Sequence, residues 1–212
     1  MATVVPTVLA ATPEEYTAMF ARAQSLSQRV HVDICDGQFT DNQTIGLAQV
    51  QVEEGVELDL HLMIQDPVAQ LETASSLKPH LIIFHAEASG DIVGAMAHVR
   101  ELGIKAGVAI LPQTPVETAR SLIDRADHVL VFTGTLGRNG GDFKPDQLPR
   151  VREVRAIKST VEVSVDGGIT DLNAALVVLE DVDVLYVGGF VQTAADPKAA
   201  YDSIVHQTGL RE

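Results

Sequence analysis

The sequence alternates short runs of apolar, often β-branched residues with longer amphipathic stretches from end to end. Eight such runs occur, namely TVVPTVL, RVHVDI, ELDLHLM, LIIFHA, KAGVAIL, HVLVFT, VEVSV and VLYVGG. Runs of this kind are typical of strands buried on both faces, and helices between them imply a parallel sheet. Eight strand–helix units in 212 residues fit a closed (β/α)8 TIM barrel better than an open sheet. We therefore predict an α/β fold in which residues 1–212 form a single (β/α)8 barrel domain.

Helix starts are marked by capping residues, most of which precede proline. The predicted starts lie at Thr12, Asp66, Thr114, Asp171 and Asp196. Their spacing places a helix after most of the apolar runs, which supports the strand–helix alternation.

The charge of the chain limits its partners. Fifteen basic residues against 29 acidic residues give a formal charge of -14, which disfavours nucleic acids and anionic membranes. Tryptophan is absent and aromatic residues make up 4%, which argues against stacking platforms for single strands. One cysteine, no secretory signal and no apolar run of about 18 residues predict a cytoplasmic protein.

Four polar residues lie at or near the ends of three apolar runs. They are His31, Asp33, His61 and Asp166. In a TIM barrel the active site lies at the C-terminal ends of the strands, so the fold would bring them together. Two imidazoles and two carboxylates form a complete ligand set for one divalent metal ion. Zn2+ is the first choice, and Fe2+, Mn2+ or Co2+ would also suit this set.

The same residues suggest a reaction. A metal of this kind can bind a carbonyl and an adjacent hydroxyl of a sugar and stabilise the enediolate formed when a carbon loses its proton. Asp33 and Asp166, placed on opposite faces of that carbon, would act as catalytic acid and base. Removal of a proton on one face and delivery on the other inverts the stereocentre, which is the reaction of an epimerase.

Two glycine pairs follow the seventh and eighth apolar runs, where loops of this fold commonly hold phosphate. They are Gly167-Gly168 and Gly188-Gly189. Glycine lets backbone amides approach an anion closely, although tight turns use glycine as well. Together the two pairs indicate a phosphorylated substrate.

The sequence resembles the ribulose-phosphate 3-epimerase family over nearly its whole length. The matching stretches, in the order of the family, are PTVL, HVDICDGQF, DLHLMIQDP, FHAEAS, AGVAILPQTP, VLVFT, VDGGI and VGG. The resemblance implies an isomerase of carbohydrate metabolism that inverts carbon 3 of a ketose phosphate, foremost D-ribulose 5-phosphate to D-xylulose 5-phosphate in the pentose phosphate pathway. It also implies a homo-oligomer, one metal ion on the four ligands, and the two aspartates as the acid/base pair.

Further substrate contacts follow from the resemblance alone. Thr7 stands where the family has a substrate-contacting serine, and Met63 stands where it has a methionine near the reacting carbons. Gly140 and Gly141 fall in the loop that corresponds to a phosphate-touching lid of the family. That loop departs from the family pattern over residues 135–142, and Arg138 adds a cation that could reach a phosphate or carboxylate.

The changed loop leaves the substrate open. An epimerase of another ketose phosphate, such as allulose 6-phosphate, and a non-catalytic sugar-phosphate or metal-binding barrel are the alternatives. Related decarboxylases and synthases carry a lysine where this chain has Cys35, which disfavours their chemistry. For Cys35 itself we expect a packing role.

Three other polar residues receive structural interpretations. His85 and Glu87, at the end of the fourth run, could join the site, but we expect them to form structural hydrogen bonds. We expect His128, which lacks a matching carboxylate pattern, to be a surface or capping residue.

Overall fold

The computed structural model describes residues 2–138 and 140–209. The strands are β1 (Thr3–Val8), β2 (Arg29–Cys35), β3 (Glu57–Met63), β4 (Leu81–His85), β5 (Lys105–Ile110), β6 (His128–Phe132), β7 (Glu162–Asp166) and β8 (Val184–Val187). The helices are α1 (Pro13–Gln24), α2 (Leu71–Ser76), α3 (Ile92–Glu101), α4 (Arg120–Ile123), α5 (Arg150–Ile157), α6 (Ala174–Val178), α7 (Gly189–Gln192) and α8 (Pro197–Thr208).

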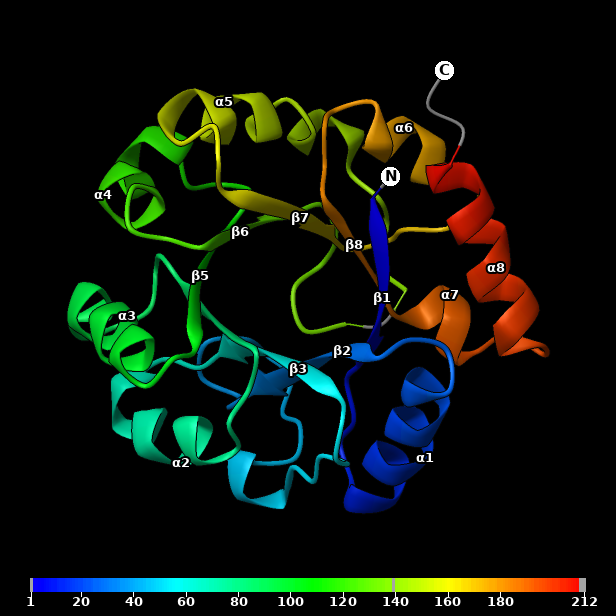
Figure 1. The fold of residues 1–212 in the computed structure, drawn as a ribbon, viewed down its shortest axis with the longest axis horizontal. Helices are drawn as coiled ribbons and strands as arrows, with labels where there is room; N and C mark the ends of the chain where they lie inside the picture. Colours follow the sequence, from blue (N-terminus) through cyan, green and yellow to red (C-terminus); the bar gives the residue numbers. More distant parts are fainter. Residues whose placement is uncertain (1, 139, 210–212) are drawn as a thin grey trace.

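The strands form a closed parallel barrel. Each strand pairs with the next along the chain, and β1 pairs with β8 to close the ring. Figure 1 shows this ring from the N-terminal ends of the strands, with the helices arranged around it. The predicted TIM barrel is confirmed, and the predicted apolar runs coincide with the strands to within a few residues.

The helix starts confirm the predicted caps only in part. The side chains of Thr12 and Asp196 accept hydrogen bonds from backbone amides in the first turns of α1 and α8. The prediction for Asp171 is wrong, because α6 begins only after Asn173. There the chain first makes a turn, in which the Asn173 side chain accepts a hydrogen bond from the backbone amide of Thr170.

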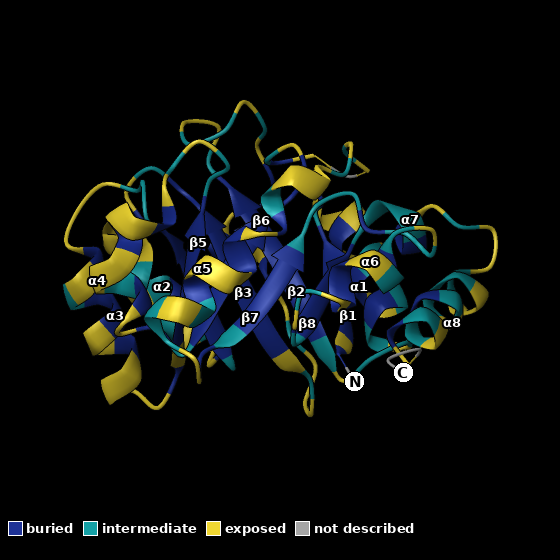
Figure 2. Ribbon diagram, turned by 90° about the horizontal axis from the view of Figure 1, so that it is seen from above, coloured by how far each residue is buried: buried dark blue, intermediate teal, exposed yellow. Residues whose placement is uncertain are grey.

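Two apolar layers surround the barrel wall. The larger layer fills the space between the strands and the helices, and Figure 2 shows the strands buried beneath helices whose outer faces are exposed. The smaller layer lies inside the barrel and consists of Val5, Leu81, Ile83, Ala109, Leu130, Phe132, Val184 and Tyr186. It leaves room for polar side chains at both ends of the barrel interior.

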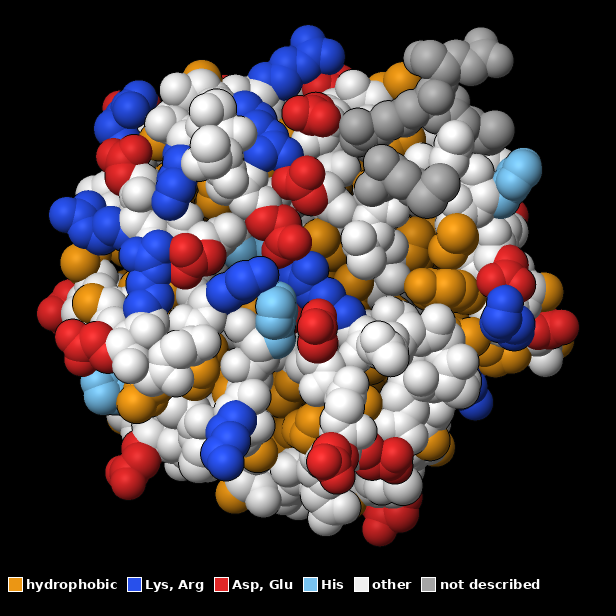
Figure 3. Space-filling view, viewed as in Figure 1, with side chains coloured by type: hydrophobic (Ala, Val, Ile, Leu, Met, Phe, Trp, Pro, Cys, Tyr) orange, Lys and Arg blue, Asp and Glu red, His pale blue; other side chains and the backbone are white. Residues whose placement is uncertain are grey.

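The N-terminal end of the interior holds a charged cluster, which we call the lower cluster. Its members are Arg29, Asp59, Glu162, His128 and Ser164. Arg29 donates to Asp59 at 2.7 Å and to Glu162 at 2.9 Å. The prediction for His128 is wrong, because its ring is fully buried between Glu162 and Ser164, each at 2.7 Å. Figure 3 shows basic, acidic and histidine side chains interspersed around the centre of this end of the molecule.

Among the described residues, none of the helices has the length and apolar character needed to span a bilayer.

Candidate active site

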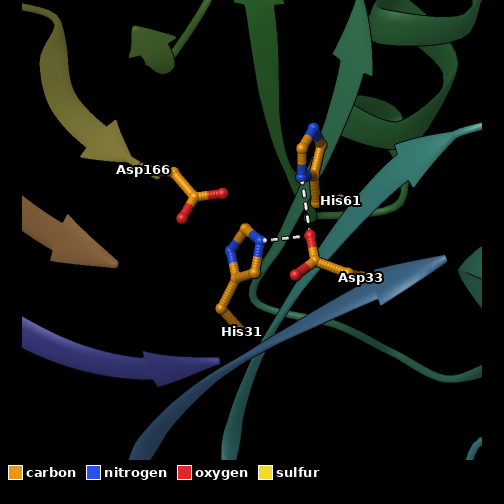
Figure 4. A group of neighbouring side chains, drawn as sticks. All are labelled: His31, Asp33, His61 and Asp166. Atoms are coloured by element: carbon orange, nitrogen blue, oxygen red, sulfur yellow. Dashed lines mark hydrogen bonds and ion pairs between the residues drawn. The ribbon is translucent and has the colours of Figure 1, made fainter. Parts of the chain in front are cut away.

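The four predicted ligands converge at the C-terminal end of the barrel interior; we call them the upper cluster. His31 and Asp33 lie two residues apart on β2 and so face the same side of the sheet. The register of β2 and β3 pairs Asp33 with His61, and Asp166 is the last residue of β7. Figure 4 shows the four side chains pointing toward one another.

The distances within the upper cluster are short. One carboxylate oxygen of Asp33 lies 2.8 Å from Nδ1 of His61 and 3.1 Å from Nε2 of His31. One donor atom from each of the four residues lies within 4.8 Å of all the others. Four nitrogen and oxygen atoms converging in this way could hold one divalent metal ion.

Burial makes negative charge in the upper cluster unfavourable. Both imidazoles are fully buried, and Asp33 exposes 7% of its surface. Within the described residues, neither carboxylate of the cluster forms an ion pair with lysine or arginine, and Nδ1 of His31 is buried without a hydrogen-bond partner. Buried carboxylates without a cation are costly, so the donor set fits a bound metal ion.

The pKa values of the two carboxyl groups are shifted in opposite directions. Burial, followed by the negative charge of Asp33, raises the pKa of Asp166 to about 7. Burial alone would also raise the pKa of Asp33, but the charges of His31 and His61 and hydrogen bonds with them outweigh burial and lower it. A pair of carboxyl groups whose pKa values are pushed apart can supply one base and one acid.

A cavity of about 270 Å³ opens above the upper cluster. Asp33 and Asp166 line it, whereas His31 and His61 do not and are fully buried. All the substrate-binding residues predicted from the sequence line it as well, namely Thr7, Met63, Gly140, Gly141, Gly167, Gly168, Gly188 and Gly189. Among the described residues that line this cavity, Arg138 is the only lysine or arginine.

The loops after β6 and β7 meet backbone to backbone beside the cavity. A Cβ atom on Gly134 would lie 2.6 Å from Cα of Gly167, and one on Gly168 would lie 2.5 Å from the carbonyl oxygen of Gly141. Gly167 and Gly168 also have positive φ angles of 110° and 72°. These glycines are therefore required by the packing of the loops, whatever they contribute to a phosphate.

Two more residues contact the upper cluster, and of these the sequence suggested only His85. His85 at the end of β4 places its Nε2 2.8 Å from Nε2 of His61, and burial lowers the pKa of His85 to about 4. The ring of Tyr186 on β8 packs against His31 with ring centroids 4.0 Å apart. The FHAE stretch was the available signal for His85, but the sequence does not show which strand residues meet across a barrel.

Cys35 is buried, its Sγ lies 3.8 Å from Sδ of Met63, and burial raises the pKa of its thiol to about 12. These observations agree with the predicted packing role. Asp36 accepts hydrogen bonds from the backbone amides of Gln38 and Phe39, both at 2.8 Å, and so shapes the turn after β2.

The fold is a closed (β/α)8 barrel, and two carboxyl groups line a cavity at the C-terminal ends of its strands. A sequence model described as "Ribulose-phosphate 3 epimerase family" matches residues 3–192. The chain belongs to the ribulose-phosphate 3-epimerase family and is an enzyme of the isomerase class, an epimerase.

Three curated relatives carry the name ribulose-phosphate 3-epimerase. The protein from Mycobacterium tuberculosis is 34% identical over 187 residues, which cover 85% of this chain and 82% of the relative. The protein from Mycobacterium leprae is 32% identical over 213 residues, covering 97% and 95%. The protein from Bacillus subtilis is 32% identical over 183 residues, covering 82% and 84%.

Solved structures support the fold at lower identity. 3-Hexulose-6-phosphate synthase from Salmonella typhimurium superposes with a TM-score of 0.74 at 16% identity, covering 99% of this chain and 100% of that chain. 3-Keto-L-gulonate-6-phosphate decarboxylase from Vibrio cholerae gives 0.72 at 13% identity, covering 98% and 97%. At this identity the likeness concerns the barrel alone.

Proposed function

We propose that this epimerase interconverts D-ribulose 5-phosphate and D-xylulose 5-phosphate by inverting carbon 3. The observation that carries the proposal is the pair of carboxyl groups, Asp33 and Asp166, which line one cavity and have pKa values shifted in opposite directions. They come from β2 and β7, which are separated by β8 and β1 around the ring. The pair therefore reaches a bound sugar from two directions.

In this mechanism the two carboxyl groups exchange roles with each turnover. The Asp33 carboxylate takes the proton from carbon 3 on one face, and the bond electrons move toward the oxygen of the carbon 2 carbonyl. The Asp166 carboxyl then delivers its proton to carbon 3 on the other face, which inverts the configuration. Afterwards Asp33 is protonated and Asp166 is ionised, which is the state needed for the reverse reaction.

His31, Asp33, His61 and Asp166 would hold the divalent metal ion that the family implies. When bound, the ion supplies positive charge that stabilises negative charge developing on the sugar oxygens. We propose Zn2+ first because mixed imidazole and carboxylate ligands suit it, with Fe2+, Mn2+ and Co2+ as competitors. Metal analysis of the purified protein distinguishes them.

The phosphate group fits the glycine-rich rim of the cavity. Gly140, Gly141 and the pairs 167–168 and 188–189 all line it, and their backbone amides have no side chains in front of them. Arg138 lines the same cavity and can donate charge-assisted hydrogen bonds to an anion. Thr7 and Met63 are placed to contact the rest of the sugar.

Solvent exchange tests the proposal directly. D-ribulose 5-phosphate incubated in D2O with the metal-loaded enzyme should acquire deuterium at carbon 3, and Asp33→Asn and Asp166→Asn should each reduce the rate by about 10²–10⁴-fold. Turnover like that of the wild type in either variant contradicts the assigned roles. Metal binding without any exchange would instead support the non-catalytic alternative.

A second candidate substrate is a six-carbon ketose phosphate such as allulose 6-phosphate. A wider cavity of about 880 Å³ adjoins the first and shares Leu9, Phe132, Gly137 and Arg138 with it. This space, bordered by the changed loop, favours a longer sugar. Asn139 in that loop lies outside the described residues. Comparison of kcat/KM for both sugars decides between them, and a clear preference for the five-carbon sugar excludes the alternative.

A homo-oligomer, a cytoplasmic location and the absence of nucleic-acid partners stay predictions. The -14 charge supports the last of these. Light scattering on the purified protein tests the first.

A further inference from the structure

We propose that His85 and Glu87 are positioning residues that hold His61 in the tautomer needed to bind the metal ion through Nδ1. The inference rests on the metal site of the proposed function. It assigns a role to a buried histidine and a partly buried glutamate that the acid/base mechanism does not use.

The two ring nitrogens of His61 have different neighbours. Nδ1 lies 2.8 Å from the Asp33 carboxylate and faces the upper cluster, while Nε2 lies 2.8 Å from Nε2 of His85. The rings of His61 and His85 are fully buried and stacked, with centroids 4.9 Å apart. The two Nε2 atoms therefore contact each other directly.

A contact between two imidazole nitrogens needs one donor and one acceptor. If Nδ1 of His61 gives its lone pair to a metal ion, its ring proton must be on Nε2, which then donates to His85. His85 must in turn carry its own proton on Nδ1. The tautomer of His85 thus decides whether His61 can bind a metal.

Glu87 stands where this proton requires an acceptor. Its Oε2 lies 3.5 Å from Nδ1 of His85, and both atoms are buried. The Thr114 hydroxyl also interacts with the Glu87 carboxylate, and a hydroxyl can either donate or accept. Oε1 of Glu87 accepts a hydrogen bond of 3.0 Å from the backbone amide of Leu111, which fixes the carboxylate. A carboxylate in this place stabilises the proton on Nδ1 of His85 and so disfavours the tautomer that blocks the metal.

The opposite arrangement is available without Glu87. His61 could carry its proton on Nδ1 and donate to Asp33, with Nε2 accepting from His85. That state satisfies the hydrogen bonds of the metal-free site but leaves no lone pair for the ion. The role of Glu87 is to bias the pair of rings against it.

The substitution Glu87→Gln keeps the size of the side chain and reverses the direction of its hydrogen bond with Nδ1 of His85. The amide oxygen must accept from Leu111, so the amide nitrogen faces Nδ1 of His85 and donates to it. The proton of His85 then moves to Nε2, and that of His61 moves to Nδ1. We expect the Zn2+ dissociation constant, measured by competition with a chromophoric chelator, to rise about ten- to a hundredfold.

The lower cluster supplies a matched control. Glu162 lies 2.7 Å from Nδ1 of His128, as Glu87 faces Nδ1 of His85, but His128 contacts none of the four ligands. Glu162→Gln should leave the Zn2+ dissociation constant within about twofold of the wild type. Circular dichroism and thermal melting confirm that each variant is folded before metal binding is measured.

A second variant separates positioning from general damage. His85→Leu removes the middle of the chain of contacts and should also weaken Zn2+ binding, but adding Glu87→Gln to it should cause no further loss. In the zinc-loaded wild type, long-range 1H–15N correlation should show His85 protonated at Nδ1.

Three results with the variants and the zinc-loaded protein would overturn the inference, besides a wild type that does not bind zinc: zinc affinity of Glu87→Gln equal to that of the wild type, additive losses in the double variant, or His85 protonated at Nε2. None of these concerns the proposed substrate, which carbon 3 exchange tests separately. If the wild type binds zinc without exchange, the proposed function fails while the positioning role stands. A wild type that does not bind zinc overturns the positioning role.

Discussion

The barrel interior holds histidine and carboxylate side chains at both of its ends, but only the lower cluster contains a cation of its own. There Arg29 lies between Asp59 and Glu162, and the hydrogen bonds of His128 and Arg29 outweigh burial and lower the pKa of Glu162. In the upper cluster two carboxylates and two imidazoles meet without lysine or arginine among them. The same residue types thus form a network with its own cation at one end and the proposed metal site at the other.

The two clusters differ because the upper cluster has no lysine or arginine side chain. A buried carboxylate that already has its cation gains little from a ligand, whereas a pair that lacks one is poised to bind one. Position in the fold agrees, because active sites of TIM barrels lie at the C-terminal ends of the strands and the opposite end serves stability.

The largest expected effect comes from removing the cation of the lower cluster. Arg29→Leu leaves two carboxylates without their arginine and should lower the free energy of unfolding by about 3–5 kcal/mol, measured by urea denaturation. The control Arg152→Leu breaks an ion pair whose arginine is 74% exposed and should change it by less than about 1 kcal/mol. Equal effects would mean that the lower cluster does not act as a buried network.

Opposite signs are expected when one carboxyl group is neutralised in each cluster. At pH 8 with metal removed by a chelator, Asp166→Asn should stabilise the protein by about 1–2 kcal/mol because it relieves repulsion with Asp33. Glu162→Gln should destabilise it by about 1–3 kcal/mol because it weakens bonds to Arg29 and His128. Thermal melting of both variants checks the signs, and a shared sign would remove the distinction between the clusters.

A smaller effect is expected from Arg138, the cation that lines the cavity of the upper cluster. Arg138→Ala should raise KM for the sugar phosphate about tenfold and leave kcat within about twofold, because the phosphate is bound equally in ground and transition states. Arg125→Ala, an exposed arginine outside the cavity, should leave both unchanged. A loss confined to kcat would place Arg138 in the chemistry instead.

The smallest effect concerns pH. The folded pKa of Glu162 is lowered, so its stabilisation is present above the unfolded value of about 4.5 and is lost as pH falls below it. The folded pKa of Asp166 is raised to about 7, so the metal-free protein loses stability as pH rises from about 4 to 7. Urea titrations across this range give the free energy of unfolding at each pH. Glu162→Gln should lose the Glu162 contribution to the fall in stability below pH about 4.5, and Asp166→Asn should lose the fall between pH about 4 and 7. Unchanged profiles would contradict both assignments.

The strands and the upper cluster were predictable because their signals are local. Apolar runs mark the strands, and a polar residue near the end of a run falls at the active-site end of a barrel. Lower-cluster contacts depend on register around the closed ring: His128 meets Glu162 from the neighbouring strand, 34 positions away. His128 was predicted to lie at the surface because no carboxylate pattern matched it, and the sequence alone does not show that Glu162 lies beside its ring.

The helices were predicted less well, for a related reason. Asp171 has the sequence of a cap, but the chain after β7 makes an extra turn held by Asn173 before α6 begins. Likewise the stretches after Asp66 and Thr114 begin with 3-10 turns, Val68–Gln70 and Val116–Ala119, before α2 and α4. Packing against the barrel sets these starts, and a local capping signal does not contain that information.

The backbone contact between Gly134 and Gly167 determines where this enzyme can diversify. Neither position has room for a Cβ, so the start of the loop after β6 is fixed against the loop after β7. A Cβ on Gly141 would meet the backbone nitrogen of Thr135 at 3.0 Å, so the far end of the loop is constrained as well. Between these anchors Gly137 and Gly140 also have positive φ angles of 69°, and a Cβ on Gly137 would lie 2.9 Å from Oγ1 of Thr40. Libraries for new sugar specificity should therefore randomise Leu136 and Arg138 and leave the glycines untouched.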